Sequence, residues 1–184
     1  MHRYTEVTVH GRFQPPLHVN HWNYIKHGFD IADHVTILIT NPFHDESYEE
    51  TASWRSDPEN NPFTYDHRVQ LFEKFFKEKS IPSDRFDFRP FNIQDPVAFA
   101  ELDPSTPNIV NVYSDWSAKK VELFKEHNLE VIQLNQEKSQ PVSGTLIRQI
   151  IKEHGNDPMI LEMKLLKAGF MPEAIPGLLD FLSN

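Results

Sequence analysis

Short apolar runs recur along the chain from residue 5 to residue 134, separated by segments with a different spacing. Val7 and Val9 alternate with polar neighbours, which is the period-2 pattern of a strand. The run 34–40 is nearly continuous and apolar, as in strands that are buried on both faces of a parallel sheet. We therefore predict five strands, at residues 5–10, 34–40, 85–91, 108–113 and 129–134.

Between these runs, apolar residues recur every three to four positions, which predicts amphipathic helices. Gly28 and Asp30 suit the end of the first helix, and Thr64 suits the N-terminal cap of the second. The segment 41–61 is polar and without periodicity, so we expect a long loop there. The predicted helices span residues 19–31, 64–76, 117–127, 145–154, 158–168 and 172–182, with a short helical turn at Pro96.

Strands that alternate with helices predict an α/β fold, because right-handed crossovers place helices on both faces of a parallel sheet. We expect a Rossmann-like, doubly wound, five-stranded parallel sheet followed by a C-terminal helical segment. A length of 184 residues suits one domain, with the α/β core at 1–154 and the C-terminal helices at 155–184. Ligands bind such sheets at the carboxyl ends of the strands, which places residues 11–21 at the expected crevice.

Composition narrows the classes of function. The formal net charge of −9 argues against a protein that binds nucleic acid, and an acidic nucleotide-binding protein must gather positive groups locally and recruit a divalent cation. The chain has no cysteine, which excludes disulfides and thiolate chemistry and favours a cytoplasmic location. We expect neither a signal peptide nor a membrane span. Homo-oligomerisation stays open.

The junction GRFQPPLHVNH, residues 11–21, concentrates groups that suit an anion site. Gly11 permits a tight turn and a close approach to a ligand. His18 and His21 lie three residues apart at a helix start, where free backbone N–H groups and the helix dipole already favour an anion. We interpret the pair as a phosphate clamp. The alternative is that both histidines only cap and pack the helix; a zinc site fits less well because no third ligand stands at motif spacing.

A second anion motif, SGTLIR, spans residues 143–148. Ser143 or Thr145 can cap the helix, and Gly144 lets the backbone approach a ligand closely. Arg148 falls on the polar side of this helix, which places it for a phosphate rather than for the core. Neither a GxxxxGK[ST] loop nor a GxGxxG fingerprint is present, which weighs against a P-loop enzyme and a dinucleotide-dependent dehydrogenase.

These motifs resemble the GRFQPxHxGH and SGTxIR signatures of the nucleotidyltransferase superfamily, and most closely those of archaeal-type nicotinamide-nucleotide adenylyltransferases. NPFTYDHR (61–68) is similar to the family's NPFTxxER segment, with His67 at the acidic position, and Asn20 stands where the family has glycine. VYSDWSAKKVELFKE (112–126) is similar to the strand and helix that carry a YSxN-type sequence. The resemblance implies catalytic roles for His18, His21 and Arg148. It implies nucleotide or phosphate contacts for Gly11, Arg12, Phe13, Gln14, Ser143, Gly144 and Thr145.

The resemblance implies transfer of a nucleotidyl group from a nucleoside triphosphate, most simply ATP, to a small phosphorylated metabolite such as nicotinamide mononucleotide, with release of pyrophosphate. Mg²⁺ would be held by the triphosphate, with no protein side chain as a metal ligand. The segment 40–61 does not match the usual substrate loop of such enzymes, so a cytidylyltransferase acting on a phosphonate is an alternative. The glycine departure at Asn20 leaves a catalytically silent nucleotide-binding module as a second alternative.

Five residues are candidates for binding the acceptor or the base, and four of them have an alternative. Trp54 and Arg55 can stack on and pair with the acceptor or can anchor the loop that carries them. Arg68 can contact a ligand or form a salt bridge, and Trp116 can contribute to the base-binding side. Arg12 can likewise reach the acceptor's phosphate or form a structural ion pair.

Overall fold

A computed structural model describes residues 3–43, 57–135 and 141–183 of the chain. Its contacts divide the chain into two compact units, which are treated separately below. The first unit comprises Met1–Arg12, Tyr24–Pro42 and Ser83–Lys138. The second comprises Phe13–Asn23, Phe43–Pro82 and Ser139–Asn184. No described helix is both long enough and apolar enough to cross a membrane.

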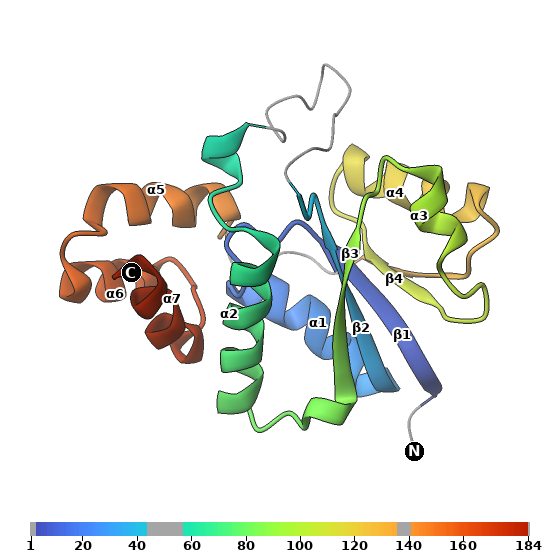
Figure 1. Ribbon diagram of the computed structural model, residues 1–184, viewed down its shortest axis with the longest axis horizontal. Helices are drawn as coiled ribbons and strands as arrows, with labels where there is room; N and C mark the ends of the chain where they lie inside the picture. The colour runs from blue at the N-terminus through green and yellow to red at the C-terminus, as the bar shows by residue number, and fades with distance from the viewer. Residues whose placement is uncertain (1–2, 44–56, 136–140, 184) are drawn as a thin grey trace. The chain divides into compact units, whose positions relative to one another are not determined.

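The first unit contains a five-stranded, all-parallel sheet with the strand order β3-β2-β1-β4-β5 (Figure 1). The order reverses between β1 and β4, which is the switch point at which doubly wound sheets bind ligands. β2 is buried over most of its length, as its apolar run predicts, whereas β1 is buried at residues 7–10 without the alternation that its sequence predicts. The strands are β1 (Tyr4–Gly11), β2 (Ala32–Thr40), β3 (Phe86–Phe91), β4 (Asn108–Asn111) and β5 (Val131–Leu134).

Helices of the first unit cover both faces of this sheet. Gly28 of α1 (Val19–Ile31) lies against the side chains of Val9 and Val35. The ring of His10 packs on Phe124 of α4 (Asp115–Glu126), with 4.9 Å between centroids. Adjacent residues of a strand point to opposite faces, so α1 and α4 lie on opposite sides of β1. The short helix α3 (Pro96–Ala100) lies near α4 in Figure 1. The predicted doubly wound α/β fold is confirmed.

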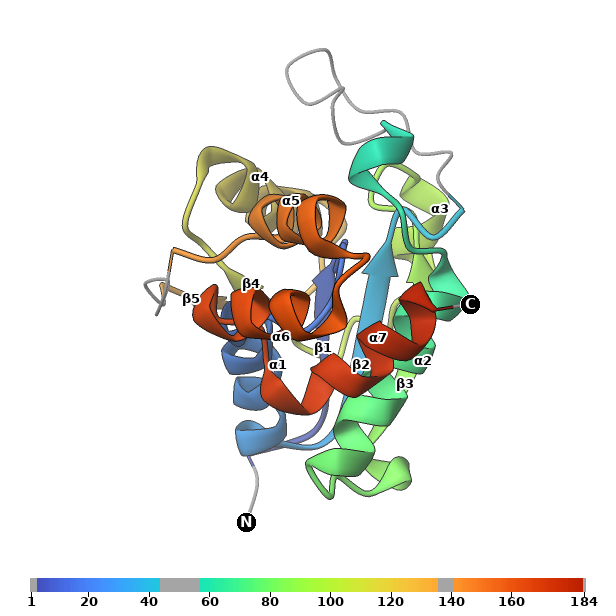
Figure 2. The same ribbon diagram turned by 90° about the vertical axis from the view of Figure 1, so that its left-hand side faces the viewer.

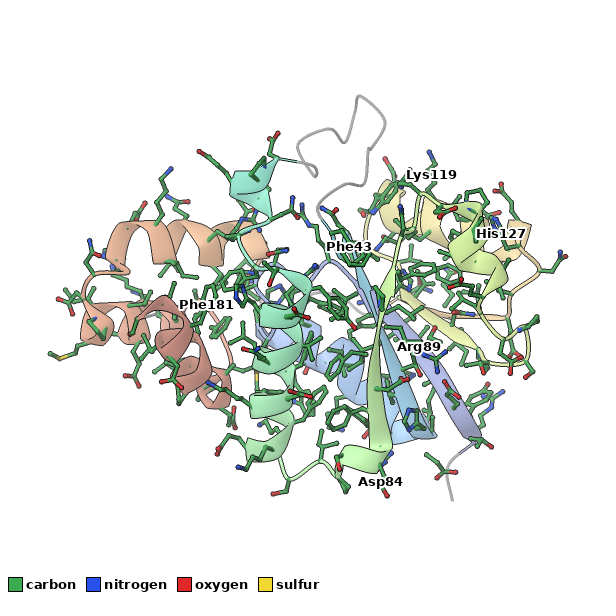
Figure 3. All side chains as sticks on the ribbon, viewed as in Figure 1. Phe43, Asp84, Arg89, Lys119, His127 and Phe181 are labelled. Carbon is green, nitrogen blue, oxygen red and sulfur yellow. The ribbon has the colours of Figure 1, made fainter. Side chains whose placement is uncertain are left out.

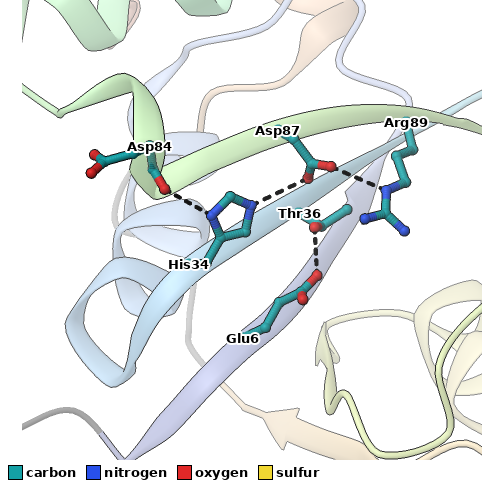
Figure 4. A network of polar contacts seen from close by, with 6 residues as sticks. All are labelled: Glu6, His34, Thr36, Asp84, Asp87 and Arg89. Atoms are coloured by element: carbon teal, nitrogen blue, oxygen red, sulfur yellow. Dashed lines mark hydrogen bonds and ion pairs between the residues drawn. The ribbon is translucent and has the colours of Figure 1, made fainter.

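Polar contacts also connect the strands of the first unit (Figure 4). The Thr36 hydroxyl donates to Glu6 at 2.7 Å, which joins β2 to β1. The His34 ring lies between the Asp84 carbonyl, at 3.0 Å, and the Asp87 carboxylate, at 3.6 Å, which joins β2 to β3. These contacts fall on the early parts of the strands, so the carboxyl ends are left for ligand chemistry.

The second unit is helical. It contains the 3-10 turn η2 (Pro58–Asn60), α2 (Tyr65–Glu78), α5 (Gly144–His154), α6 (Pro158–Lys167), η4 (Pro172–Ala174) and α7 (Ile175–Leu182). Thr64 caps α2 by accepting the His67 N–H at 3.2 Å, as predicted. Ion pairs from Lys74 to Asp180 and from Lys79 to Glu173 fasten the C-terminal segment to α2. Figure 2 shows α5, α6 and α7 in succession, with α7 beside α2.

The first helix spans 19–31 as predicted, but the interpretation of Gly28 and two other predicted boundaries are wrong for identifiable reasons. Gly28 lies inside α1 rather than at its end, where a Cβ would meet Val35 Cγ2 at 3.3 Å. The fourth strand stops at Asn111 and α4 begins at Asp115, because Ser117 Oγ accepts the N–H groups of residues 113 and 114 in a capping box. The last helix opens as a 3-10 turn, since Pro176 has no N–H to donate to the preceding turn.

Candidate active site

The turn that follows β1 places two histidines at the start of α1. Their rings stack, with centroids 3.5 Å apart and planes inclined by 22°. The edge of the His21 ring also meets Phe13, with centroids 5.1 Å apart. The two imidazoles therefore share one side of the turn, as their i, i+3 spacing predicts.

His18 is buried, and its two ring nitrogens have different surroundings. Its Nδ1 accepts the backbone N–H of His21 at 3.3 Å, which caps the first turn of α1. An imidazole whose Nδ1 accepts a hydrogen bond carries its proton on Nε2. The capping interpretation and the phosphate interpretation are thus compatible, because Nε2 is a donor while Nδ1 holds the helix.

Gln14 joins the turn that carries the two histidines (residues 13–21, the histidine turn) to the NPFT segment (residues 61–64). Its Nε2 donates to the Phe63 carbonyl at 2.7 Å, and its Oε1 accepts the Phe63 N–H at 3.0 Å. The side chain is buried, so both partners are satisfied away from water. Its first role in the structure is to position residues 61–64, and the predicted nucleotide contact stays a prediction.

The SGTLIR helix lies directly against the same turn. Ser143, one of the two candidate caps, accepts the Leu146 N–H at 3.2 Å and so caps α5. A Cβ at position 144 would stand 2.5 Å from the Gln14 carbonyl oxygen, so only glycine permits this approach. The structure therefore brings together the two anion motifs that the sequence predicts.

Arg148 extends across this contact and holds three segments at once. Its guanidinium donates to the Gln14 carbonyl at 2.6 Å, to Asn60 Oδ1 at 2.8 Å and to Thr145 Oγ1 at 3.1 Å. All three acceptors are neutral. Partial burial lowers the pKa of Arg148 from its ordinary value, which still leaves an arginine charged near neutral pH. A half-buried cation whose hydrogen-bond acceptors are all neutral favours the binding of an anion nearby.

Asn20, the departure from the family's glycine, points toward the entry of the SGTLIR helix. Its Nδ2 donates to the Val142 carbonyl at 3.4 Å, which is a long hydrogen bond. Val142 is buried and immediately precedes the cap residue Ser143. The side chain that replaces glycine thus connects the two motifs.

The remaining predicted residues have varied positions. Arg68 is buried near the start of α2, where its Nε donates to the Thr64 carbonyl at 3.2 Å. Gly11 ends β1 and is followed by Arg12 in the first unit, which also contains Trp116 in the first turn of α4. Trp54 and Arg55 lie outside the described residues. Within the described ranges, no group of three or more His, Cys, Asp or Glu side chains is placed to hold a metal ion.

Two contributors to the site are missed by sequence reasoning. Asn60 is a partner of Arg148 but carries no motif signal of its own beyond its place before NPFT. The segment 169–171 pairs with the backbone on both sides of His18, and backbone pairing leaves no residue-type signature.

Comparison with known proteins identifies the class of protein that this fold and site define. No protein-family model matches the chain. A crystal structure of a bifunctional NMN adenylyltransferase/ADP ribose pyrophosphatase from Francisella tularensis superposes with a TM-score of 0.63 and 19% identity, covering 100% of this chain and 49% of that one. The same enzyme complexed with AMP and a manganese ion gives 0.60 and 18%, covering 96% and 52%. The chain thus spans about half the length of these structures and shares their fold.

A relative in sequence makes the assignment specific. The chain is 33% identical over 147 residues to the phosphonoformate cytidylyltransferase of Streptomyces viridochromogenes, and the match covers 79% of each chain. The chain belongs to the nucleotidyltransferase family that includes this cytidylyltransferase, which confirms the superfamily recognised from the motifs. The resemblance to the archaeal type stays a prediction.

Proposed function

We propose that this nucleotidyltransferase transfers a cytidylyl group from CTP to a phosphonate or another small phosphorylated acceptor, with release of pyrophosphate. The substrate class is supported by the relative, a phosphonoformate cytidylyltransferase that is 33% identical. The site itself is supported by one observation above others: Arg148 is partly buried against three neutral oxygens. An anionic ligand supplies a charge opposite to that of the guanidinium, whose hydrogen-bond partners in the described part of the chain are neutral.

The chemistry needs no nucleophile from the protein. An oxygen of the acceptor forms a bond to the α-phosphorus, and the bond from that phosphorus to the pyrophosphate oxygen breaks. A phosphate acceptor is already largely ionised near neutral pH, since its second pKa is about 6. The protein therefore has to position and stabilise charge, as in phosphoryl transfer generally.

The positions of the described side chains indicate which of them binds the reacting phosphates and which stabilises the pyrophosphate. Nε2 of His18 donates a hydrogen bond to the reacting phosphates, and the stacked His21 ring lies beside it. Arg148 neutralises the departing pyrophosphate from the SGTLIR helix, where exposed N–H groups also favour an anion. Mg²⁺ on the β- and γ-phosphates would supply further charge neutralisation; a related fold was crystallised with AMP and a manganese ion.

A second candidate is adenylyl transfer from ATP to nicotinamide mononucleotide. It is supported by the resemblance of the GRFQPPLHVNH and SGTLIR motifs and by the shared fold of the two NMN adenylyltransferase structures. Both candidates use the same phosphate site and differ in the base and the acceptor. We further propose a cytoplasmic location, with a nucleoside triphosphate and a small phosphorylated metabolite as the binding partners.

A substrate matrix tests the proposal. CTP and ATP are each incubated with Mg²⁺ and with phosphonoformate, other phosphonates, nicotinamide mononucleotide or nicotinate mononucleotide, and released pyrophosphate is measured. We expect release only when triphosphate, cation and acceptor are all present, with CTP and a phosphonate as the best pair. Release without any acceptor would indicate a hydrolase, and turnover of ATP with nicotinamide mononucleotide alone would favour the second candidate.

A further inference from the structure

The residue before His18 has a strained backbone. Leu17 has φ 79°, in the left-handed region that residues other than glycine and asparagine rarely adopt. Its side chain is buried. Phe13, in the same turn, has φ 49°. Such residues persist only where the surrounding structure holds them. The direction in which His18 leaves the turn therefore depends on whatever restrains Leu17.

That restraint comes from the C-terminal segment. The Met171 N–H donates to the Leu17 carbonyl at 3.0 Å, and the Val19 N–H donates to the Gly169 carbonyl at 2.9 Å. Between these bonds, His18 pairs with Phe170 in an antiparallel bridge. Gly169 has φ 88°, so the segment itself requires glycine at this position. His18 is thus bracketed by backbone hydrogen bonds on both sides.

The segment is anchored firmly enough to act as a restraint. Phe170 is buried, and Glu173 in the following turn pairs with Lys79 of α2 at 2.7 Å. Farther along, Phe181 of α7 packs on Phe63, with 4.9 Å between centroids (Figure 3). Phe63 is the residue that Gln14 holds through its backbone, so the C-terminal segment contacts the histidine turn directly and through the NPFT segment.

We propose that residues 169–171 are a positioning element for the transferase reaction, which hold Leu17 in its left-handed conformation and thereby aim the His18 ring. The proposal rests on the proposed function for its kinetic consequence. It assigns a role to the segment between α6 and η4, which lies outside the stretches that carry the family resemblance.

The substitution Met171→Pro tests the proposal because it removes the Met171 N–H, which donates to the Leu17 carbonyl. Met171 has φ −71°, which lies in the range that proline adopts. The proline Cδ would take the place of the N–H that donates to the Leu17 carbonyl at 3.0 Å, so the hydrogen bond is lost and the carbonyl has to move away. We expect kcat to fall about 10- to 100-fold, because small misplacements of a catalytic group are costly, while the KM for CTP changes less than about threefold. The ¹⁵N resonances of the His18 ring, assigned by comparison with His18→Asn, should shift.

Two controls separate positioning from general damage. Met171→Ala keeps the N–H and should leave kcat and the His18 resonances unchanged. Gly177→Ala alters α7, where the atom nearest to an added Cβ is Cδ of the Lys74 side chain at 3.2 Å, and it should behave likewise. Wild-type kcat and unmoved His18 resonances in Met171→Pro would overturn the proposal.

Gly169→Ala provides a second route if Met171→Pro does not fold. It perturbs the other hydrogen bond of the bridge through the left-handed φ of Gly169, and it should shift the His18 resonances and lower kcat in the same direction. An unchanged Gly169→Ala protein would overturn the proposal. Should the wild-type protein release no pyrophosphate with any acceptor, the proposed function fails, and the His18 resonances alone decide whether the segment positions that ring.

Discussion

His18 uses its two ring nitrogens for different purposes. Nδ1 accepts the His21 N–H and caps α1, while Nε2 keeps the proton and can donate to a ligand. From the sequence, capping and phosphate binding were competing explanations of the same residue. The structure makes them two ends of one side chain, so a substitution that keeps one end and removes the other can separate them.

The substitution His18→Asn should make that separation. The asparagine oxygen can replace Nδ1 as the cap, since asparagine is among the best N-terminal caps, but no group replaces Nε2. We expect turnover to fall about 100-fold or more, by analogy with the loss of a preorganised donor, with a smaller loss of stability than in His18→Ala. Pyrophosphate release and urea unfolding measure the two effects. An active His18→Asn enzyme would leave capping as the only role of His18.

Arg148 should not tolerate lysine. Arg148→Lys preserves the charge but cannot reproduce the fork that reaches the Gln14 carbonyl and Asn60 together. We expect kcat/KM for the triphosphate to fall about 10- to 100-fold. Lys152→Ala on the same helix is the matched control and should stay near the wild-type value. Equal activity of Arg148→Lys would mean that charge alone is sufficient.

At the level of elements, periodicity and capping chemistry predict most of the fold. The apolar runs of β1 and β2, the Thr64 cap and the Ser143 cap all appear where the sequence placed them. The wrong boundaries occur where a capping side chain or a proline decides where the helix begins, as at Ser117 and Pro176, and the role of Gly28 depends on a contact beyond its helix. Gly28 reads in sequence as a helix end, but it is glycine because α1 lies so close to Val35.

The connection between the histidine turn and the NPFT segment depends on one side chain. Gln14→Met removes both hydrogen bonds to the Phe63 backbone and leaves a buried N–H and C=O without that partner. We expect the free energy of unfolding to fall by about 2–4 kcal/mol, measured by urea titration. Gln149→Met, at an exposed position of α5, should change it by less than about 0.5 kcal/mol. Similar losses in both variants would show that the two hydrogen bonds between Gln14 and Phe63 contribute little to stability.

On the scale of the whole molecule, the site is built from segments that are far apart in sequence. Arg148 and Gln14 are 134 positions apart, and their contact uses a backbone carbonyl that any residue would supply. Residue types alone therefore indicated two anion motifs, and the family resemblance implied nucleotide or phosphate contacts for residues of both. The pairing of residues 169–171 with the histidine turn left no signal at all, because it runs through the backbone.

The stability of the molecule should depend on pH through His10. Burial, with a smaller contribution from Lys120, lowers the pKa of His10 well below 6.5. Below that pH the unfolded chain binds a proton that the folded chain excludes, so stability falls as the pH decreases, by up to about 1.4 kcal/mol per pH unit. His10→Phe, which keeps a ring against Phe124, should show a flatter profile between about pH 7 and about pH 5 in urea unfolding. Parallel profiles in the two proteins would assign the pH dependence to other groups.

The three hydrogen bonds of Arg148 also provide a way to detect anion binding in the protein itself. An anion that draws on the guanidinium alters the electron density at every oxygen that it already bonds, including the side-chain amide of Asn60. The NH₂ resonances of Asn60 should therefore respond to triphosphates, pyrophosphate and non-reactive analogues alike. Ligands can then be ranked by nuclear magnetic resonance before any acceptor is known, so the search for the substrate need not wait for turnover.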